Sequence, residues 1–439
     1  MSGASYGGLE AICSAFLTLS TASAPDNGDR LWAYRAFVNY WLGRVAATGG
    51  NQILSLWISW RLYELTGSAW LLGMAGLIQF LPSLFFFLWA GDLADRMDRR
   101  LILLVVMLMQ VLVTGTLLAT EAAGLVSGDL LLWLCVLIGS MRPFQLSSQQ
   151  SLPPRLVPMR LLPRAMALSN AGSQGMFIVG PAVAGLLLLW GPYEVLVLCM
   201  VTFGSAAFFY WRVRYNFVRS IHRSRSLKDM LSGFAFVRAH PSILGSITLD
   251  LFVVMLGGVT ALLPIYAKDV LAVDTWGLGL MRGAPAIGAL ILSIVLARWS
   301  INRHVGRIMF ISVAVYASSL LVFGLSHSLW LSVIALAISG AADMVSVVIR
   351  QSLVQLDTPD EMRGKVSAIN SVCIGASNQL GEFRAGISAH WLGAAGAVTV
   401  GALGSLIVAG LWMRCFPQLW RRQTLNGEPS NEAASLGKK

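Results

Sequence analysis

The sequence predicts an all-α, polytopic membrane protein with twelve transmembrane helices in two pseudo-repeated six-helix halves. Two observations lead to this prediction. Hydrophobic residues make up 56% of the 439 residues and charged residues only 12%, whereas about a quarter of a soluble domain is charged. The apolar residues also fall into long runs of about the 20 residues that a helix needs to cross a bilayer. We therefore expect most of the chain to lie in a lipid bilayer.

The apolar runs define twelve candidate spans in chain order. They cover residues 35–60, 69–91, 101–120, 130–152, 165–190, 194–213, 243–266, 276–298, 305–325, 329–355, 366–391 and 396–415. Arginine and lysine gather in the even-numbered connections, while the odd-numbered connections carry mainly acidic residues. Because positively charged loops stay in the cytoplasm, both termini are expected to be cytoplasmic.

A basic linker is predicted to divide the chain into two halves. The predicted order is a cytoplasmic tail at 1–34, a six-helix bundle at 35–213, the linker at 214–241, a second bundle at 242–415 and a cytoplasmic tail at 416–439. Apolar residues recur at helical spacing within the linker, which predicts an amphipathic helix on the membrane surface. The triplet at 150–152 returns at 351–353 and indicates an internal repeat.

The stretch from Gly91 to Arg100 is the most strongly patterned connection. It joins two apolar runs and carries three aspartates and three arginines. Gly91 is expected to permit a close backbone turn at the end of the preceding span. The aspartates are expected to cap the next helix or to pair with neighbouring arginines. The alternative is an ordinary basic loop that only fixes the orientation of the chain.

This loop resembles the signature between helices 2 and 3 of the major facilitator superfamily, Gly-x-Leu-Ala-Asp-Arg-x-Gly-Arg-Arg/Lys. The residues that match the pattern are Gly91, Leu93, Ala94, Asp95, Arg96, Arg99 and Arg100. Asp98 stands where the pattern usually has its second glycine. The runs 249–252, 262–271, 357–366 and 377–383 resemble the exporter branch that includes macrolide efflux and enterobactin export proteins.

The resemblance implies a secondary active transporter of a bacterial inner membrane that alternates access around a central cavity. It also implies proton-coupled export of a small amphipathic compound, such as a drug, a siderophore or a metabolite. The signature residues Gly91, Asp95, Arg96, Arg99 and Arg100 would then form a gating loop. We expect this loop to stabilise the outward-open state by locking the cytoplasmic ends of the two halves. The alternatives are a lysophospholipid or other lipid transporter of the same fold, and a transport-inactive membrane sensor.

A stripe of small residues runs along the fifth span. Its members are Gly172, Gly175, Gly180, Pro181 and Gly185. The Gly180-Pro181 pair resembles the Gly-Pro element of the antiporter signature in this superfamily. Glycines permit close helix packing and proline bends a helix, so plain packing is an equal alternative.

Charged side chains inside a span are costly, so each is a functional candidate. The candidates for proton coupling are, in order of preference, the carboxylates of Asp343, Asp250 and Glu382. The candidates for lining a cavity or for pairing with these acids are Arg44, Asn51, Arg142 and Arg350. The alternative is structural pairing between helices. Spacing leaves open whether Arg142 and Arg350, at similar places in the two halves, pair with acids or hold an anionic substrate group.

The sequence does not favour an enzyme. None of the five histidines begins the His-x4-Asp pattern of an acyltransferase, and no nucleotide-binding Gly-x4-Gly-Lys-Ser/Thr loop occurs. The five cysteines are scattered, so neither a metal site nor a disulfide framework is expected, and no cofactor is implied. The net charge of +11 fits cytoplasmic loops better than nucleic-acid binding. The expected partners are a small-molecule substrate, protons and the bilayer.

Overall fold

The computed structural model describes residues 31–215, 227–299 and 303–424, and every regular element in these ranges is a helix. The first part of the chain forms η2 (Leu31–Ala33), α2 (Arg35–Thr66), α3 (Ala69–Arg96), α4 (Arg99–Ala122), α5 (Gly128–Ser151), η3 (Pro153–Arg155), η4 (Met159–Leu161), α6 (Leu162–Leu187) and α7 (Pro192–Arg212). The second part forms α8 (Leu227–Ala239), α9 (Pro241–Gly257), η5 (Thr260–Leu262), α10 (Leu263–Ile265), η6 (Tyr266–Val270), α11 (Thr275–Arg298), α12 (Val305–Leu325), α13 (Leu329–Leu356), α14 (Asp360–Cys415) and α15 (Pro417–Arg421).

Local capping explains where several helices begin and end. Ser68 accepts a hydrogen bond from the backbone N–H of Leu71 at the start of α3, and Ser127 does the same for Leu130 in α5. These hydroxyls satisfy N–H groups that have no partner within their own helix. At the end of α2 the chain turns through Gly67 with φ of 60°, a left-handed conformation that glycine adopts without steric cost.

One predicted span is broken in the structure, and two other predicted spans follow one another within a single element. The span predicted at 243–266 is broken, because α9 ends at Gly257 and the chain continues through η5, α10 and the π-helix η6. The single element α14 contains a non-helical residue, Gly393, with φ of 72° and ψ of 169°. Two helices therefore meet at Gly393, inside the predicted connection between 391 and 396.

Nine helices of the described residues are long and apolar enough to cross a membrane. Polar side chains interrupt the apolar runs of α2 and α6, which are not among the nine. Large apolar side chains such as Leu112, Trp133 and Ile407 are exposed on the outside of the molecule. This arrangement suits a surface that faces lipid, while Trp57 and Phe203 are fully buried inside.

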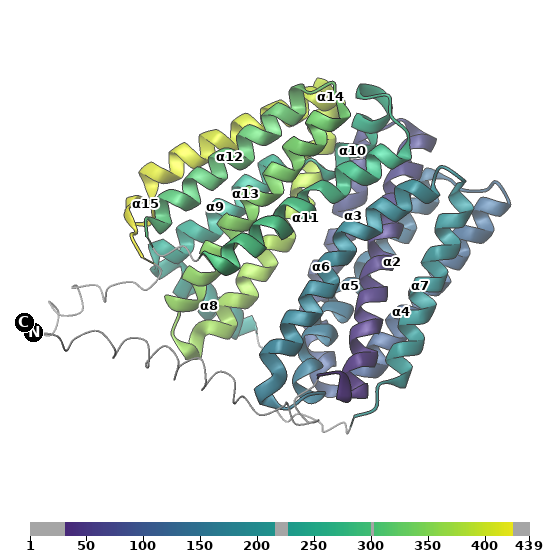
Figure 1. Ribbon diagram of the computed structural model, residues 1–439, viewed down its shortest axis with the longest axis horizontal. Helices are drawn as coiled ribbons and strands as arrows, with labels where there is room; N and C mark the ends of the chain where they lie inside the picture. Colours follow the sequence, from purple (N-terminus) through teal and green to yellow (C-terminus); the bar gives the residue numbers. More distant parts are fainter. Residues whose placement is uncertain (1–30, 216–226, 300–302, 425–439) are drawn as a thin grey trace, which may run out of the picture.

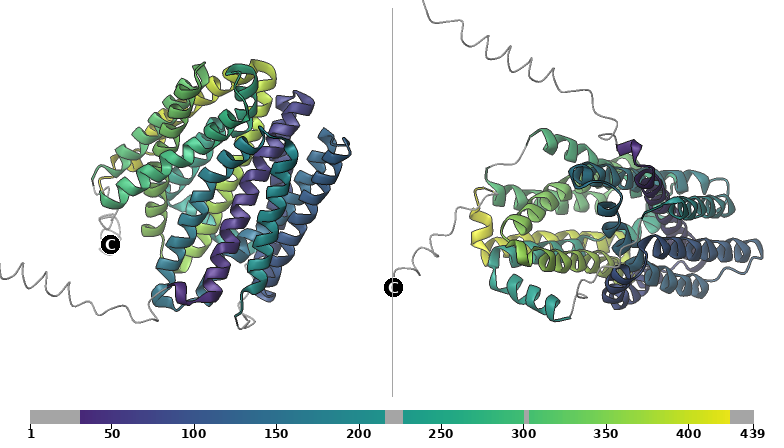
Figure 2. Two further views of the ribbon diagram at one scale, coloured as in Figure 1. Left: turned by 45° about the vertical axis from the view of Figure 1, so that its right-hand side comes forward. Right: turned by 90° about the horizontal axis from the view of Figure 1, so that it is seen from below.

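The long helices form two bundles, the first from α2 to α7 and the second from α9 to α14 (Figures 1 and 2). The bundles touch where α3 crosses α14 and where α6 crosses α11. A Cβ on Gly73 of α3 would lie 2.9 Å from Cα of Gly386, and one on Gly185 of α6 would lie 3.0 Å from Cα of Gly279. Only glycine permits so close an approach of two backbones.

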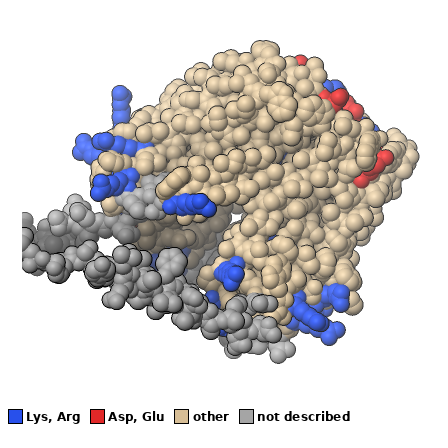
Figure 3. All heavy atoms as spheres, in the orientation of Figure 1, with Lys and Arg blue, Asp and Glu red and all other residues tan. Residues whose placement is uncertain are grey.

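Both glycine crossings lie toward the end of the molecule where α2, α4 and α6 finish, which we call the closed end. At the opposite, open end the bundles diverge (Figure 1). A recess opens between them in the space-filling view (Figure 3). Lysine and arginine gather mainly at the open end and acidic residues at the closed end on the face shown.

A helix forms in the predicted linker, as the spacing of its apolar residues indicates. It is α8, which packs against α14 and α9. Val237 of α8 is buried in a cluster with Ile369 of α14, whereas Phe234 is exposed. Linker residues 216–226 lie outside the described ranges, as do the predicted tail residues 1–30 and 425–439.

Candidate functional site

The signature stretch is more helical than its sequence predicts. Helix α3 continues to Arg96, so Gly91 lies inside the helix, and a Cβ at Gly91 would meet no atom within 4 Å. The close backbone turn expected at Gly91 is therefore wrong. The apolar and polar residues after Gly91 continue the helical hydrogen bonding, and the chain turns instead at Met97 and Asp98. The side chain of Asp98 accepts from the backbone N–H of Arg100 at 2.9 Å and caps α4.

The charges of this stretch bind groups of the first bundle. Arg96 pairs with Asp92 at 2.9 Å. Arg99 is buried and donates to the backbone oxygens of Ala94 at 2.9 Å and Ser151 at 2.7 Å, which ties the start of α4 to α3 and α5. The side chain of Asp95 lies outside the described part of the structure.

Tyr215 also holds this stretch, from the segment that follows α7. Its hydroxyl donates a hydrogen bond to Oδ1 of Asp98 at 2.6 Å. Burial, followed by the bond to the Asp98 carboxylate, raises the pKa of Tyr215 to about 12. The phenol is therefore neutral at physiological pH and acts as a donor to the residue that caps α4.

Arg44 joins α2 to α6 through neutral partners. Its guanidinium donates to the Oγ atoms of Ser169 and Ser173 at 3.1 Å, and to Oδ1 of Asn170 at 3.1 Å. It also donates to the hydroxyl of Tyr40 at 3.2 Å. These bonds use four of the five N–H donors of Arg44 and do not neutralise its charge.

The other two predicted residues of the first bundle are Asn51, in the middle of α2, and Arg142, in α5. Asn51 of α2 donates to Oε1 of Gln145 of α5 at 3.3 Å. Arg142 lies one turn from Gln145 and has an exposed side chain. Within the described ranges it makes no hydrogen bond or short ion pair, although its charge acts on Glu382 of the second bundle.

Three predicted residues meet inside the second bundle. Nη1 of Arg350 in α13 pairs closely with Oδ1 of Asp250 in α9. Nη2 of the same guanidinium lies 3.9 Å from Oδ1 of Asp343, two turns away on α13. The side chain of Asp250 is 8% exposed, whereas that of Asp343 is 42% exposed. The two carboxylates therefore share one arginine from unequal environments.

Glu382 lies apart from that group, at the contact between the bundles. A Cβ on Gly76 of α3 would lie 2.9 Å from Oε2 of Glu382, so its carboxylate packs against the first bundle. The arginines whose charges act on Glu382 are Arg282 and Arg142. Arg282 of α11 also reaches the first bundle. It donates to Oγ of Ser55 at 2.7 Å and to Oγ of Ser59 at 3.2 Å, both in α2.

Sequence reasoning missed a contact at the closed end. The hydroxyl of Tyr63 in α2 donates to the carboxylate of Asp269 in η6. Nζ of Lys268 lies 5.9 Å from the centre of the Tyr63 ring, within the range of a cation–π contact. These residues are about 200 positions apart in sequence. The only available signal was the charge of Lys268 in a connection otherwise poor in cations.

Arg384 has a structural explanation that its sequence position did not reveal. Its guanidinium donates to the backbone oxygen of Leu256, at the last turn of α9, and to that of Ala397 at 3.3 Å. The carbonyls at a helix end have no partner within the helix. Arg384 supplies donors where α9 breaks.

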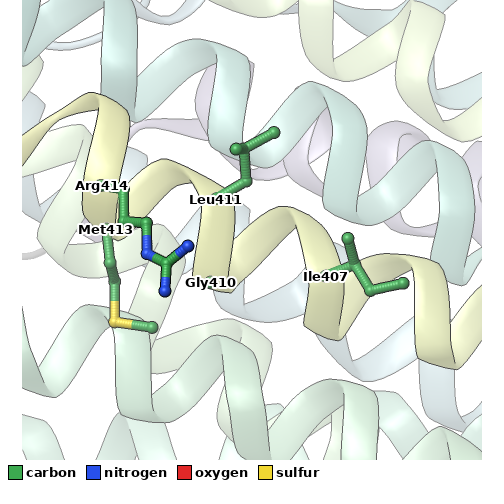
Figure 4. Close-up of a pocket in the computed structure, with 5 residues that line it drawn as sticks. All are labelled: Ile407, Gly410, Leu411, Met413 and Arg414. Atoms are coloured by element: carbon green, nitrogen blue, oxygen red, sulfur yellow. The ribbon is translucent and has the colours of Figure 1, made fainter.

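The depression in Figure 4 is separate from these charged groups. It has a volume of about 490 Å³ and is lined by Ile407, Gly410, Leu411, Met413 and Arg414. All five residues belong to α14, and Ile407 and Leu411 are exposed. The depression therefore lies on the outer surface of the second bundle.

Comparison with known proteins identifies the family. The family described as transmembrane secretion effector, within the major facilitator superfamily, matches residues 32–435. The chain belongs to this family. The predicted resemblance is thus confirmed, and the family and fold of this facilitator are those of transporters.

Two curated relatives of this facilitator have export-related names. Macrolide efflux protein A of Streptococcus pyogenes is 25% identical over 373 residues, which cover 81% of this chain and 90% of the relative. The enterobactin exporter EntS of Shigella boydii is 24% identical over 423 residues, which cover 90% of this chain and 95% of the relative.

Solved structures share the fold of this facilitator. A bacterial homologue of the lysosomal transporter Spinster, in an inward-facing and unoccupied conformation, has a TM-score of 0.68 at 13% identity, covering 88% of this chain and 98% of the other. A bacterial homologue of the iron transporter ferroportin matches with a TM-score of 0.65 inward-facing, at 18% identity and covering 88% and 99% of the two chains. Its outward-facing structure matches at 0.59, with 17% identity and 88% and 100% covered.

Proposed function

We propose that this facilitator is a proton-coupled exporter of a small amphipathic compound that works by alternating access in a bacterial inner membrane. The names of the two relatives, an efflux protein and an exporter, support outward movement of the substrate. The observation that carries the proposal is the shared pairing of Arg350 with Asp250 and Asp343 inside the second bundle. Intramembrane carboxylates with a paired arginine are typical of proton pathways in transporters.

The proposed topology has twelve spans with both termini cytoplasmic. The nine apolar helices become ten when α14 is divided at Gly393, and α2 and α6 complete the set. The polar residues that exclude α2 and α6 from the apolar set suit helices that line a wet cavity. The basic residues at the open end support a cytoplasmic position for that end (Figure 3).

The proposed state is inward-facing. The glycine crossings of α3 with α14 and of α6 with α11 hold the closed end together, and the Tyr63–Asp269 contact adds to them. The bundles diverge at the basic end. The higher TM-score of the ferroportin homologue in its inward-facing structure than in its outward-facing one supports the same state.

In the proposed cycle, Asp343 is the first candidate to carry the proton. With both carboxylates ionised, the guanidinium of Arg350 is shared between two like charges, which disfavours the doubly ionised state. A proton taken up by Asp343 leaves Arg350 to pair with Asp250 alone. Release of this proton on the cytoplasmic side would restore the shared pairing. Asp250 is the second candidate, and Glu382, on which the charges of two arginines act at the bundle contact, is the third.

The gating role of Asp95, Arg96, Arg99 and Arg100 is also a proposal. In the inward-facing state the described contacts of Arg96 and Arg99 are with the first bundle. Locking of the cytoplasmic ends would occur when the open end closes. Asp95→Asn should then shift the protein away from the outward-open state; unchanged transport together with unchanged conformational accessibility would show that Asp95 has no gating role.

The test of transport uses an exporter-deficient bacterium that expresses the full chain. Accumulation of a macrolide, a cationic dye and a catecholate siderophore is measured with and without a protonophore. We expect lower accumulation of at least one compound, and loss of this effect with the protonophore. Asp343→Asn should abolish the effect, whereas Asp129→Asn, at the exposed start of α5, is the matched control that should retain it.

The outcomes separate coupling from export. Protonophore-sensitive export that survives Asp343→Asn, Asp250→Asn and Glu382→Gln would reject these carboxylates as the proton site. Export that is unchanged in the presence of the protonophore would reject proton coupling. Unchanged accumulation of all three compounds, with the protein present in the membrane, would count against this exporter function and favour lipid transport or a sensor.

A further inference from the structure

Two arginines on corresponding helices of the two bundles, α5 and α13, have unlike surroundings. Arg350 of α13 pairs with Asp250, and its side chain is only 10% exposed. Arg142 of α5 is exposed and, in the part of the chain that the structure describes, makes neither a hydrogen bond nor an ion pair within 4 Å. A guanidinium offers five N–H donors in a planar fork. All five donors of Arg142 are therefore available to a bound group.

The neighbours of Arg142 along α5 show which way it faces. Gly139 packs on α3 so closely that a Cβ would lie 2.2 Å from the backbone oxygen of Gln79. Gln145 is buried and accepts a hydrogen bond from Asn51 of α2. Residues three apart share a helical face, so Arg142 lies between Gly139 and Gln145 on the side directed toward α2 and α3. The electrostatic effect of Arg142 on Glu382 fits this inward direction.

The charges around Arg142 do not balance. The acidic residues of the first bundle lie at or near helix ends; they are Glu64, Asp92, Asp95, Asp98, Glu121, Asp129 and Glu194. The charges of both Arg142 and Arg282 act on the carboxylate of Glu382. One carboxylate between two guanidinium groups leaves an excess of one positive charge. Such an excess inside a membrane protein is costly unless an anion or water compensates for it.

We propose that Arg142 binds the anionic group of the transported compound, and that the substrates are therefore amphipathic organic anions. This inference rests on the proposed exporter function and names the substrate class for it. A carboxylate or a phosphate can accept two parallel hydrogen bonds from the guanidinium fork. The charge of Arg350 is compensated by Asp250, and Arg350 belongs to the proposed proton site. The two arginines therefore have different proposed roles, substrate binding for Arg142 and proton coupling for Arg350.

The experiment compares two fluorescent probes that differ only in charge, N-dansyl-11-aminoundecanoate and its carboxamide. Binding to the full chain in detergent is measured by fluorescence anisotropy, separately from transport in proteoliposomes. We expect the wild-type protein to bind the carboxylate at least about tenfold more tightly than the carboxamide, the effect of one charge-assisted contact. Arg142→Gln should remove this difference, and Arg142→Lys should retain part of it.

Arg35→Gln is the matched control, because it removes the same charge from an exposed residue at the start of α2. It should keep the preference for the carboxylate, and thermal unfolding checks that each variant is folded. The inference would be overturned if the wild-type protein bound both probes equally or did not bind the carboxylate. It would also be overturned if a folded Arg142→Gln variant kept the preference for the carboxylate. Proton-driven transport of the carboxamide in any of these cases would leave the exporter function intact.

Discussion

The guanidinium of Arg350 lies 3.9 Å from the carboxylate of Asp343, on the same helix, while its other nitrogen pairs closely with Asp250 of α9. One arginine thus bridges a buried carboxylate and a half-exposed one. Unequal burial divides the tasks of the two acids. Asp250 compensates for the buried charge of Arg350, and Asp343 has the accessibility that proton exchange requires.

The two acids should differ in their effect on stability. Asp250→Asn leaves the charge of Arg350 buried without its main partner, and should lower the free energy of unfolding by on the order of 3 kcal/mol. Asp343→Asn removes a longer pairing whose carboxylate is half-exposed, and should cost less than about 1 kcal/mol. Thermal unfolding of both purified variants in detergent tests the difference. Equal losses would contradict the division of tasks between the two carboxylates.

The Tyr63–Asp269 contact should favour the inward-facing state. Tyr63→Phe removes the hydroxyl that joins the two bundles at the closed end, so the population of outward-open molecules should rise. Distances between spin labels across the closed end measure this population. Tyr193→Phe is the control, because Tyr193 donates to the backbone oxygen of Glu121 within the first bundle. An equal shift in both variants would rule out a specific latch.

Two Gly→Ala substitutions in the same helix should have opposite effects. At Gly73 a Cβ would press on Gly386 of the second bundle at 2.9 Å, so Gly73→Ala should separate the closed end and reduce export. At Gly91 a Cβ meets nothing within 4 Å, and alanine in a helix is favoured by about 0.5–1 kcal/mol. Gly91→Ala should therefore be at least as stable as wild type in thermal unfolding. A marked loss of stability at Gly91 would contradict its placement in α3.

The bond from Tyr215 to Asp98 should give a pH-dependent contribution to stability. The pKa of Tyr215 is raised from 10.0 to about 12, so the folded state favours the neutral phenol. This stabilisation is fully present below pH 10 and is lost as the pH rises toward 12, because the unfolded chain then releases the proton first. The difference in Tm between wild type and Tyr215→Phe should be constant from pH 8 to about 10 and shrink above it. A difference in Tm that grew with pH would contradict the raised pKa of Tyr215.

The stretch from Gly91 to Arg100 shows how much of a local structure a sequence motif predicts. Its residues identify the superfamily, and the cap by Asp98 follows from its position before α4. The conformation of Gly91 did not follow, because glycine tolerates both turn and helix, and the helical hydrogen bonds of α3 decided between them.

The sequence by itself determined that the protein is a helical membrane protein, and it showed which charged residues lie inside the apolar runs. It could do so because a bilayer admits a chain only as closed hydrogen-bonded elements, and helices need long apolar runs. Only the tertiary structure decided that Arg350 is paired, that Arg142 has no ion pair within 4 Å among the described residues, and that Tyr63 contacts Asp269. Spacing along one helix says which residues share a face, whereas the partner of a charge is set by the helix that packs against it.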